Sequence, residues 1–200
     1  MLITSLQGYI MKKSNISDYD NLIVRHCSPT LAGIKPSSLF TCHHNKECNI
    51  SKCVLNWNKA LNNSGIFVKA LKNTDSYSLI YLYRKDLLQL EISDCLNAQF
   101  LKEYGYKCDT VDNCLNCLAE RLNNDVFPHE IGIFLGYPLD DVKAFILNAG
   151  SSYLECGCWK AYSNSSKAKE KFALFNLCTR TYCKKFAEGY TLTKLVSACK

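Results

Sequence analysis

The chain has 200 residues, of which 48% are hydrophobic, and its formal net charge at pH 7 is +6. This length suits one globular domain over residues 1–200 with a single sizeable core, and no stretch reaches the roughly 18 apolar residues of a membrane helix. The first fifteen residues have no positively charged leader before an apolar run. We therefore expect neither secretion nor a membrane span, and a cytoplasmic location.

Thirteen cysteines are the unusual feature of the composition. Without a secretion signal, they indicate a reducing compartment where thiols persist. Cys114 and Cys117 have the spacing of metal ligands, although core packing on one helix face explains the pair as well. A second group of soft ligands comprises Cys42, His43, His44, Cys48 and Cys53. We expect no metal and no other cofactor, with a non-catalytic metal or iron–sulfur protein as an alternative.

The stretch 21–39, NLIVRHCSPTLAGIKPSSL, carries the first candidate site. Leu22–Val24 are typical of a short strand, and Pro29 fits the first turn of a following helix. Cys27 would then lie at the helix start, where free backbone N–H groups and the positive end of the helix dipole favour a thiolate. Cys27 is therefore a candidate nucleophile.

The middle of the chain alternates between helical and strand patterns. Residues 73–76 have turn chemistry between two apolar runs, which predicts an antiparallel hairpin. Its strands are expected at 66–71 and 77–83. Gly65 is a good stop for the helix before them. Helices are expected at 47–63, 86–104 and 110–123.

The stretch 126–148, VFPHEIGIFLGYPLDDVKAFILN, carries the second candidate site. Residues 130–135 are typical of a buried strand, with His129 at its mouth, and Pro138 favours the start of a new helix. Asp140 and Asp141 lie in the first turn of that helix, where acidic side chains complement the dipole.

A cysteine followed about a hundred residues later by a histidine, and then by an acid, is the chain order of papain-like enzymes. In that arrangement a thiol heads a helix that packs on an antiparallel sheet, and a histidine reaches it from a strand. We therefore expect an α+β fold in which Cys27 is the nucleophile, His129 the base, and Asp141 or Asp140 the group that orients the imidazole.

Three segments strengthen this hypothesis: HCSPTLAGIKPSSLF, FPHEIGIFLGYPLDDVKAFILNAG and CGCWKAYSN. Together they resemble a family of small proteins from anaerobic bacteria that includes cysteine-protease-like amide synthetases of closthioamide-type biosynthesis. The resemblance spans nearly the whole chain. It implies a papain-like fold and the catalytic residues Cys27 and His129, and it favours Asp141 over Asp140.

The resemblance also implies a reaction. Cys27 takes an acyl chain from a phosphopantetheine thioester on a peptidyl carrier protein and passes it to a diamine, with 1,3-diaminopropane as the expected co-substrate. Thioester exchange is close to thermoneutral, so no ATP is needed. A narrow apolar channel would keep water from the acyl-enzyme, and Tyr137 and Trp159 are candidates to line it. A peptidase or amidase with the same triad is the nearest alternative.

The positive charge is concentrated at the C-terminal end. Residues 160–200 contain nine Lys or Arg residues and two acidic residues. A cationic face of this kind attracts an acidic partner, for which an acidic carrier protein is the expectation. We expect no nucleic acid partner, because the lysines fall on an amphipathic helix without an RNA-binding motif.

Overall fold

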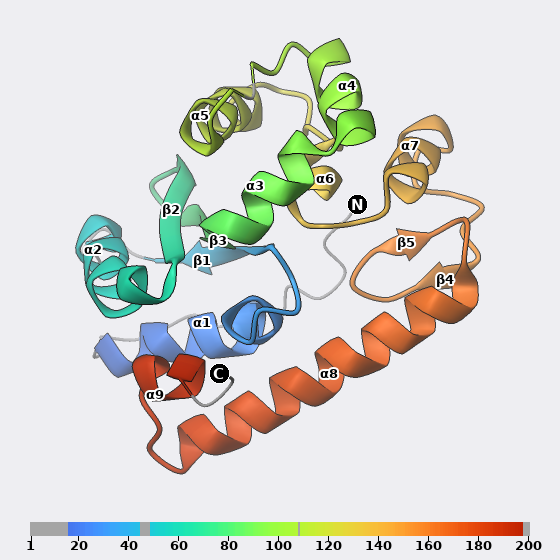
Figure 1. Ribbon diagram of the computed structural model, residues 1–200. Coiled ribbons are helices and arrows are strands. Elements are labelled where there is room, and N and C mark those ends of the chain that lie inside the picture. The colour runs from blue at the N-terminus through green and yellow to red at the C-terminus, as the bar shows by residue number, and fades with distance from the viewer. Residues whose placement is uncertain (1–15, 45–48, 108, 198–200) are drawn as a thin grey trace.

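The computed structural model describes residues 16–44, 49–107 and 109–197, and within them the chain is an α+β protein with a small antiparallel sheet (Figure 1). The strands are β1 (Ser37–His43), β2 (Ile66–Asn73), β3 (Tyr77–Arg84), β4 (Glu155–Cys156) and β5 (Lys160–Ala161). The helices are α1 (Ile16–Leu31), α2 (Ile50–Leu61), α3 (Lys85–Ser93), α4 (Cys95–Glu103), α5 (Val111–Leu122), α6 (Ile131–Phe134), α7 (Leu139–Leu147), α8 (Ser165–Ala187) and α9 (Leu192–Ser197), with a 3₁₀ turn η1 (Asn62–Ser64) after α2.

The main sheet has the strand order β1-β3-β2 and is antiparallel throughout. β3 is central and apolar on both faces, because successive side chains point to opposite sides of a strand. Ile80 and Leu82 pack into the cluster that includes α1, α2 and α9, whereas Leu79 and Tyr81 pack into the cluster that includes α3, α5 and α6. Figure 1 shows these two helical layers on either side of the sheet.

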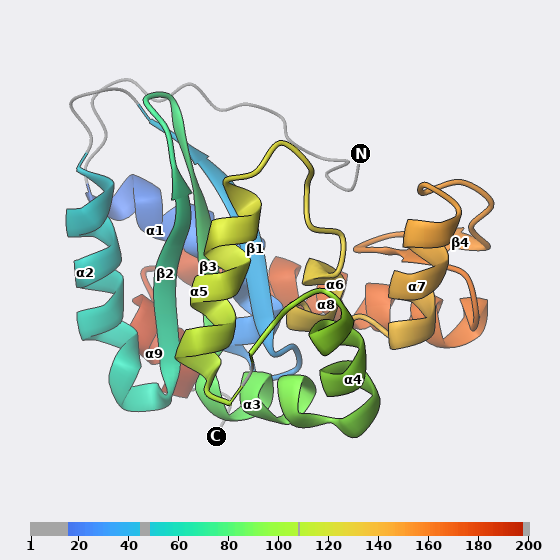
Figure 2. The same ribbon diagram turned by 90° about the horizontal axis from the view of Figure 1, so that it is seen from above.

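The last part of the chain forms a separate packing unit beside this sheet. Figure 2 shows α7 and the two short strands β4 and β5 set to one side of the three main strands. The long helix α8 runs from this unit back along α1, so it connects the two parts of the molecule. Trp159 and Phe172 form the centre of a small apolar cluster at the start of α8.

The region around Cys27 differs from the sequence prediction. Leu22–Val24 do not form a strand, because α1 is continuous from Ile16 to Leu31. Tyr19, Ile23, Cys27 and Leu31 recur every four residues and are all buried, which is the periodicity of one helix face. Cys27 therefore lies near the end of a helix and not at its start, so the predicted position was wrong.

Side chains bond to carbonyls in the last turns of α1. Pro29 lies inside the helix and has no N–H to donate, and beside it the Ser28 hydroxyl donates to the carbonyl of Val24. The Arg84 guanidinium donates to the carbonyls of Thr30 and Leu31 at distances of 2.7 and 2.5 Å. A cationic side chain on the last carbonyls of a helix stabilises that end, so β3 fixes the end of α1.

The segment before Pro138 also differs from the prediction. Residues 131–134 form the single helical turn α6 and not a strand, and His129 belongs to the turn that leads into it. The predicted helix at 86–104 is two helices, separated at Asp94, whose side chain accepts from the backbone N–H groups of Leu96 and Asn97. Asp94 therefore caps the start of α4.

The other predicted elements are confirmed. The hairpin of β2 and β3 is present, α2, α5 and α7 lie within or close to their expected bounds, and the basic C-terminal helix is α8. Thr110 caps α5 by accepting from the N–H of Asn113, and Gly65 adopts a φ of 72° after the turn that ends α2. These local signals are strong because each meets a backbone requirement of its own.

Replacing Gly157 with alanine is expected to destabilise the protein by about 1–3 kcal/mol, because a β-carbon at this position would overlap the Phe172 ring. Urea unfolding of the variant and the wild type measures the difference. In a Phe172→Ala background the same glycine change should cost less, since the overlapping ring is gone. Equal costs in both backgrounds would contradict the proposed contact.

Candidate functional site

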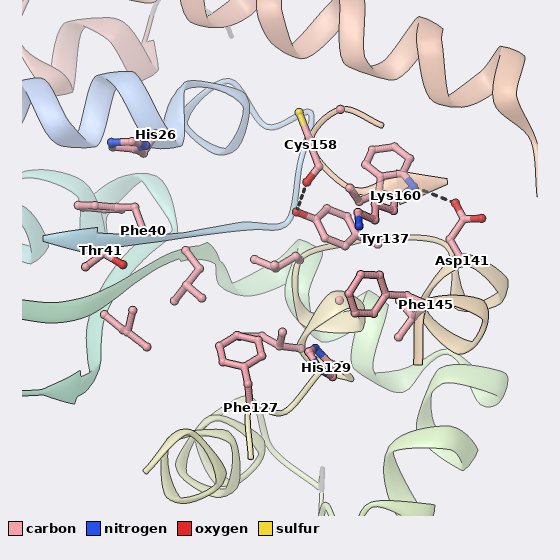
Figure 3. Close-up of a pocket in the computed structure, with 18 residues that line it drawn as sticks. His26, Phe40, Thr41, Phe127, His129, Tyr137, Asp141, Phe145, Cys158 and Lys160 are labelled. Atoms are coloured by element: carbon pink, nitrogen blue, oxygen red, sulfur yellow. Dashed lines mark hydrogen bonds between the residues drawn. The ribbon is translucent and has the colours of Figure 1, made fainter. Parts of the chain in front are cut away.

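A cavity of about 220 Å³ lies between the edge strand β1 and the segment that carries α6, α7 and the β4–β5 hairpin (Figure 3). Its lining is mainly apolar and aromatic. The aromatic and aliphatic side chains include Leu39, Phe40, Phe127, Tyr137, Phe145 and Trp159. The polar and titratable ones include His26, Thr41, His129, Asp141, Cys158 and Lys160. Tyr137 and Trp159, for which the sequence left both core packing and pocket lining open, line this cavity, and Trp159 is also buried in a small apolar cluster.

Asp141 holds one wall of this cavity in place. The carboxylate is only 3% exposed, and it accepts hydrogen bonds from the Trp159 indole at 2.8 Å and from the backbone N–H of Tyr162 at 2.8 Å. The backbone N–H and the hydroxyl of Ser163 donate to it at 3.0 Å. Both carboxylate oxygens are therefore used to join the first turn of α7 to the segment that follows β4.

His129 also lines the cavity, between two aromatic rings. Its imidazole centroid is 5.5 Å from the ring of Phe127 and 5.1 Å from that of Phe145. The Nδ1 atom is buried and has no hydrogen-bond partner among the described residues. Burial also lowers the pKa of His129 below its usual value, since a charged imidazolium is poorly solvated there. The imidazole is therefore neutral at pH 7.

Cys27 is completely buried under the cavity wall and is not among the side chains that line the cavity. Burial raises the pKa of its thiol to about 12, while the Lys35 ammonium and a hydrogen bond with Ser38 act in the opposite direction. The end of α1 is the negative end of the helix dipole, which also disfavours a thiolate. In this conformation Cys27 is a protonated thiol.

The three residues predicted as a triad are thus only partly brought together. His129 and Asp141 line the same cavity, while Cys27 belongs to the core layer between α1 and the sheet. In the described contacts, Asp141 is bound by Trp159, Tyr162 and Ser163 and not by His129. Asp140, the alternative acid, is exposed and does not line the cavity.

Sequence reasoning missed Lys35, which follows α1 in the loop before β1. Its ammonium lies over the ring of Tyr137, 5.2 Å from the centroid, and interacts electrostatically with Cys27 and Cys158. Burial lowers the pKa of Lys35 to about 8, although the two cysteines act against this effect. The signal available in the sequence was a single lysine in the segment LAGIKPSS, surrounded by apolar and small residues.

The missed residues His26 and Phe40 close the cavity on the α1 side. Their rings are stacked with centroids 5.1 Å apart and an interplanar angle of 8°. Burial is the larger of two effects that lower the pKa of His26, and the charge of Arg25 is the other. Figure 3 shows this pair on the far side of the cavity from His129 and Phe145.

Neither a metal cluster nor a membrane helix is found in the described part of the chain. Within residues 16–44, 49–107 and 109–197, no group of three or more His, Cys, Asp or Glu side chains is arranged to hold a metal ion. One expected ligand, Cys48, lies outside these ranges. Over the same ranges, every helix is too short or too polar to cross a bilayer.

Taken together, the fold and the cavity define an α+β protein with an aromatic pocket that combines a neutral histidine with a fully bonded aspartate. The sequence pattern of one family, DUF3793, matches residues 23–196. This family is described as a protein of unknown function, and the chain belongs to it. No curated protein and no solved structure matched the chain.

Proposed function

We propose that this protein is a thiol-dependent acyltransferase with a papain-like arrangement, which takes an acyl chain from a carrier-bound thioester and transfers it to a diamine to form an amide. The observation that carries the proposal is the aromatic cavity, with the unpartnered Nδ1 of His129 in its wall. Apolar walls suit an acyl chain, and the free nitrogen suits a proton transfer or a hydrogen bond to the reacting group.

His129 has the properties required of a base for this reaction. An alkylamine has a pKa of about 10.4, so nearly all of it is protonated at pH 7 and cannot attack a thioester. The lowered pKa of His129 keeps the imidazole neutral at pH 7, so it can accept the proton that a neutral amine loses as the new C–N bond forms and the nitrogen becomes acidic. An imidazole with a raised pKa would be charged at pH 7 and could not accept this proton.

The cavity also addresses the competition with water. Amide formation succeeds only when the amine reaches the acyl-enzyme faster than water at about 55 M does, which requires a site that excludes solvent. Phe127 and Phe145 enclose His129, and Tyr137 stacks on Trp159 with centroids 5.2 Å apart. An acyl chain that fills the cavity between these aromatic side chains would displace water from the base.

The nucleophile in this proposal is Cys27. Its sulfur attacks the thioester carbonyl, a new C–S bond forms, and the carrier thiolate leaves and takes up the proton. Because the thiol is covered by the cavity wall, binding of the acyl chain has to uncover it. Lys35 already lowers the pKa of the thiol against the effect of burial, so the ammonium favours the thiolate once the sulfur is exposed.

The basic face at the start of α8 suits the acidic carrier protein of this proposal. Lys167, Lys169 and Lys171 are exposed on α8. The Lys171 ammonium lies 6.0 Å from the centroid of the Trp159 ring, and Trp159 lines the cavity. A negatively charged partner bound to these lysines would therefore be next to the pocket.

The direct test is to supply an acyl N-acetylcysteamine thioester with and without 1,3-diaminopropane and to identify the product by mass spectrometry. We expect the wild type to form the amide and to carry an acyl group on Cys27, located by peptide mapping, and Cys27→Ala to lose the amide. Free acid alone, in the presence of diamine, would instead identify a hydrolase with the same residues. Equal amide yields from wild type and Cys27→Ala would contradict the assignment of Cys27.

The covered thiol favours a second candidate function, which is non-catalytic binding of an apolar ligand in the same cavity. With a pKa of about 12, Cys27 is a poor nucleophile in this conformation, and the cavity alone is sufficient for binding. A rise in melting temperature with the thioester, without acyl-enzyme or product, would support this function over acyl transfer.

A further inference from the structure

The charge of Lys35 acts on two cysteines from distant parts of the chain. Cys27 belongs to α1, and Cys158 belongs to the turn between β4 and β5. The Lys35 ammonium interacts electrostatically with both thiols. Its charge acts to lower the pKa of each thiol, against the larger effect of burial. Figure 3 shows the sulfur of Cys158 directed toward the loop between α1 and β1, which carries Lys35.

Tyr137 holds this arrangement together. Its ring lies under the Lys35 ammonium at 5.2 Å, and its hydroxyl donates to the backbone carbonyl of Cys158 at 2.9 Å. The turn of Cys158 is itself closed by a hydrogen bond from the N–H of Gly157 to the carbonyl of Trp159 at 3.0 Å. The side chain of Tyr137 therefore links the backbone at Cys158 to the Lys35 ammonium.

The two thiols differ in access. Cys27 is completely buried, whereas Cys158 is an exposed residue that lines the cavity. Burial raises the pKa of both thiols, and for Cys27 the value reaches about 12. A reagent that approaches from solvent or from the cavity therefore meets Cys158 first.

We propose that Cys158 and Lys35 form a second thiol site at the cavity, where the Lys35 ammonium stabilises the Cys158 thiolate and the thiolate accepts acyl groups from thioesters. This proposal rests on the proposed acyl-transfer function. The thiolate attacks the carbonyl carbon, the new C–S bond replaces the old one, and the released thiolate takes a proton from water. Lys35 is a positioning residue, since it acts through the sulfur.

Alkylation by iodoacetamide tests the site without requiring turnover. The rate at each cysteine of the folded wild type is followed between pH 6 and 10 by peptide mapping. We expect Cys158 to react and Cys27 to stay unmodified until the protein is denatured. Lys35→Met should slow Cys158 at pH 7, where Lys35 is mostly charged, by about tenfold, equivalent to one pKa unit, and Lys35→Arg should restore most of the rate.

Cys156 is the matched control in the same experiment, because it is exposed two residues away in β4. Its alkylation rate should not change in Lys35→Met, which excludes a general loosening of the hairpin. A rate at Cys158 that is the same in wild type and Lys35→Met would overturn the role of Lys35. Circular dichroism of each variant confirms that the comparison is made on folded protein.

Incubation with an acyl N-acetylcysteamine thioester then tests the acceptor role. We expect the acyl group on Cys158 in the wild type and in the Cys27→Ala variant, and about tenfold less on Cys158 in Lys35→Met at short times. If Cys158 is alkylated in the Lys35-dependent way but is never acylated, the acceptor role is wrong. The amide assay is separate, because the Lys35 effect on alkylation holds even if no amide is ever formed.

Discussion

Replacing Asp141 with alanine is expected to lower the free energy of unfolding by about 2–4 kcal/mol, because one buried donor and three partly buried donors lose their acceptor at once. The indole of Trp159 is the donor least able to find water instead, since Trp159 is 4% exposed. Urea unfolding followed by tryptophan fluorescence measures the loss, and the fluorescence also reports on the Trp159 environment.

Asp140 provides the matched control for this change. It is the preceding residue, it is exposed, and it lies in the same helical turn, so Asp140→Ala should change stability by less than about 0.5 kcal/mol. The stability loss of Asp141→Asn should lie between those of Asp141→Ala and Asp140→Ala. The amide oxygen can accept some of the hydrogen bonds, but the NH₂ group is a donor and faces other donors. A stable Asp141→Ala protein that has lost only activity would show that Asp141 is primarily a catalytic residue.

Replacing His129 with alanine is expected to reduce the rate of amide formation by about 10²–10⁴-fold, the usual contribution of a general base. The measurement is the initial rate with an acyl thioester and 1,3-diaminopropane. His26→Ala is the control, because His26 lines the same cavity but stacks on Phe40 at the other side. The His26→Ala substitution should reduce the initial rate of amide formation much less.

The pH dependence of the same reaction provides a second readout for His129. A base works only in its neutral form, so the rate falls as the pH falls through the pKa of the base. The reaction is therefore started from the preformed acyl-enzyme, and the rate is divided by the concentration of neutral diamine. Because burial lowers the pKa of His129, this corrected rate should persist to a pH below the usual value for histidine, about 6.5. An acid limb at or above that value, or an unchanged limb in His129→Ala, would argue against His129 as the base.

The parts of the fold that were predicted correctly are those specified by local chemistry. The β2–β3 hairpin has turn residues between two apolar runs, and α5 and α7 begin at residues that suit a helix start. The α1 prediction failed because Pro29 was interpreted as a helix start, although the four-residue spacing from Tyr19 to Leu31 extends through it. In residues 131–134 an apolar run was interpreted as a strand, and apolar runs of this length do not distinguish strands from buried helical turns.

The site was predictable to a similar extent. His129 and Asp141 were identified from the sequence, and both line the cavity together with Tyr137 and Trp159. The bonds that Asp141 makes could not be predicted, because its donors come from residues 159–163, which no periodicity connects to α7. The relation of Lys35 to Cys158 was equally inaccessible, since it depends on how a distant hairpin packs beside the loop after α1.

The attachment of α7 to the segment after β4 has a consequence for what the cavity can accept. Four hydrogen bonds at Asp141 join that wall to the segment after β4, whereas the His26 and Phe40 side chains meet through stacked rings. A single stacked pair is worth only about 0.5–1.5 kcal/mol beyond its burial. We therefore expect a rotation of the His26 ring to accommodate a bulkier ligand more readily than a change beside Trp159, since Phe40 belongs to the buried core.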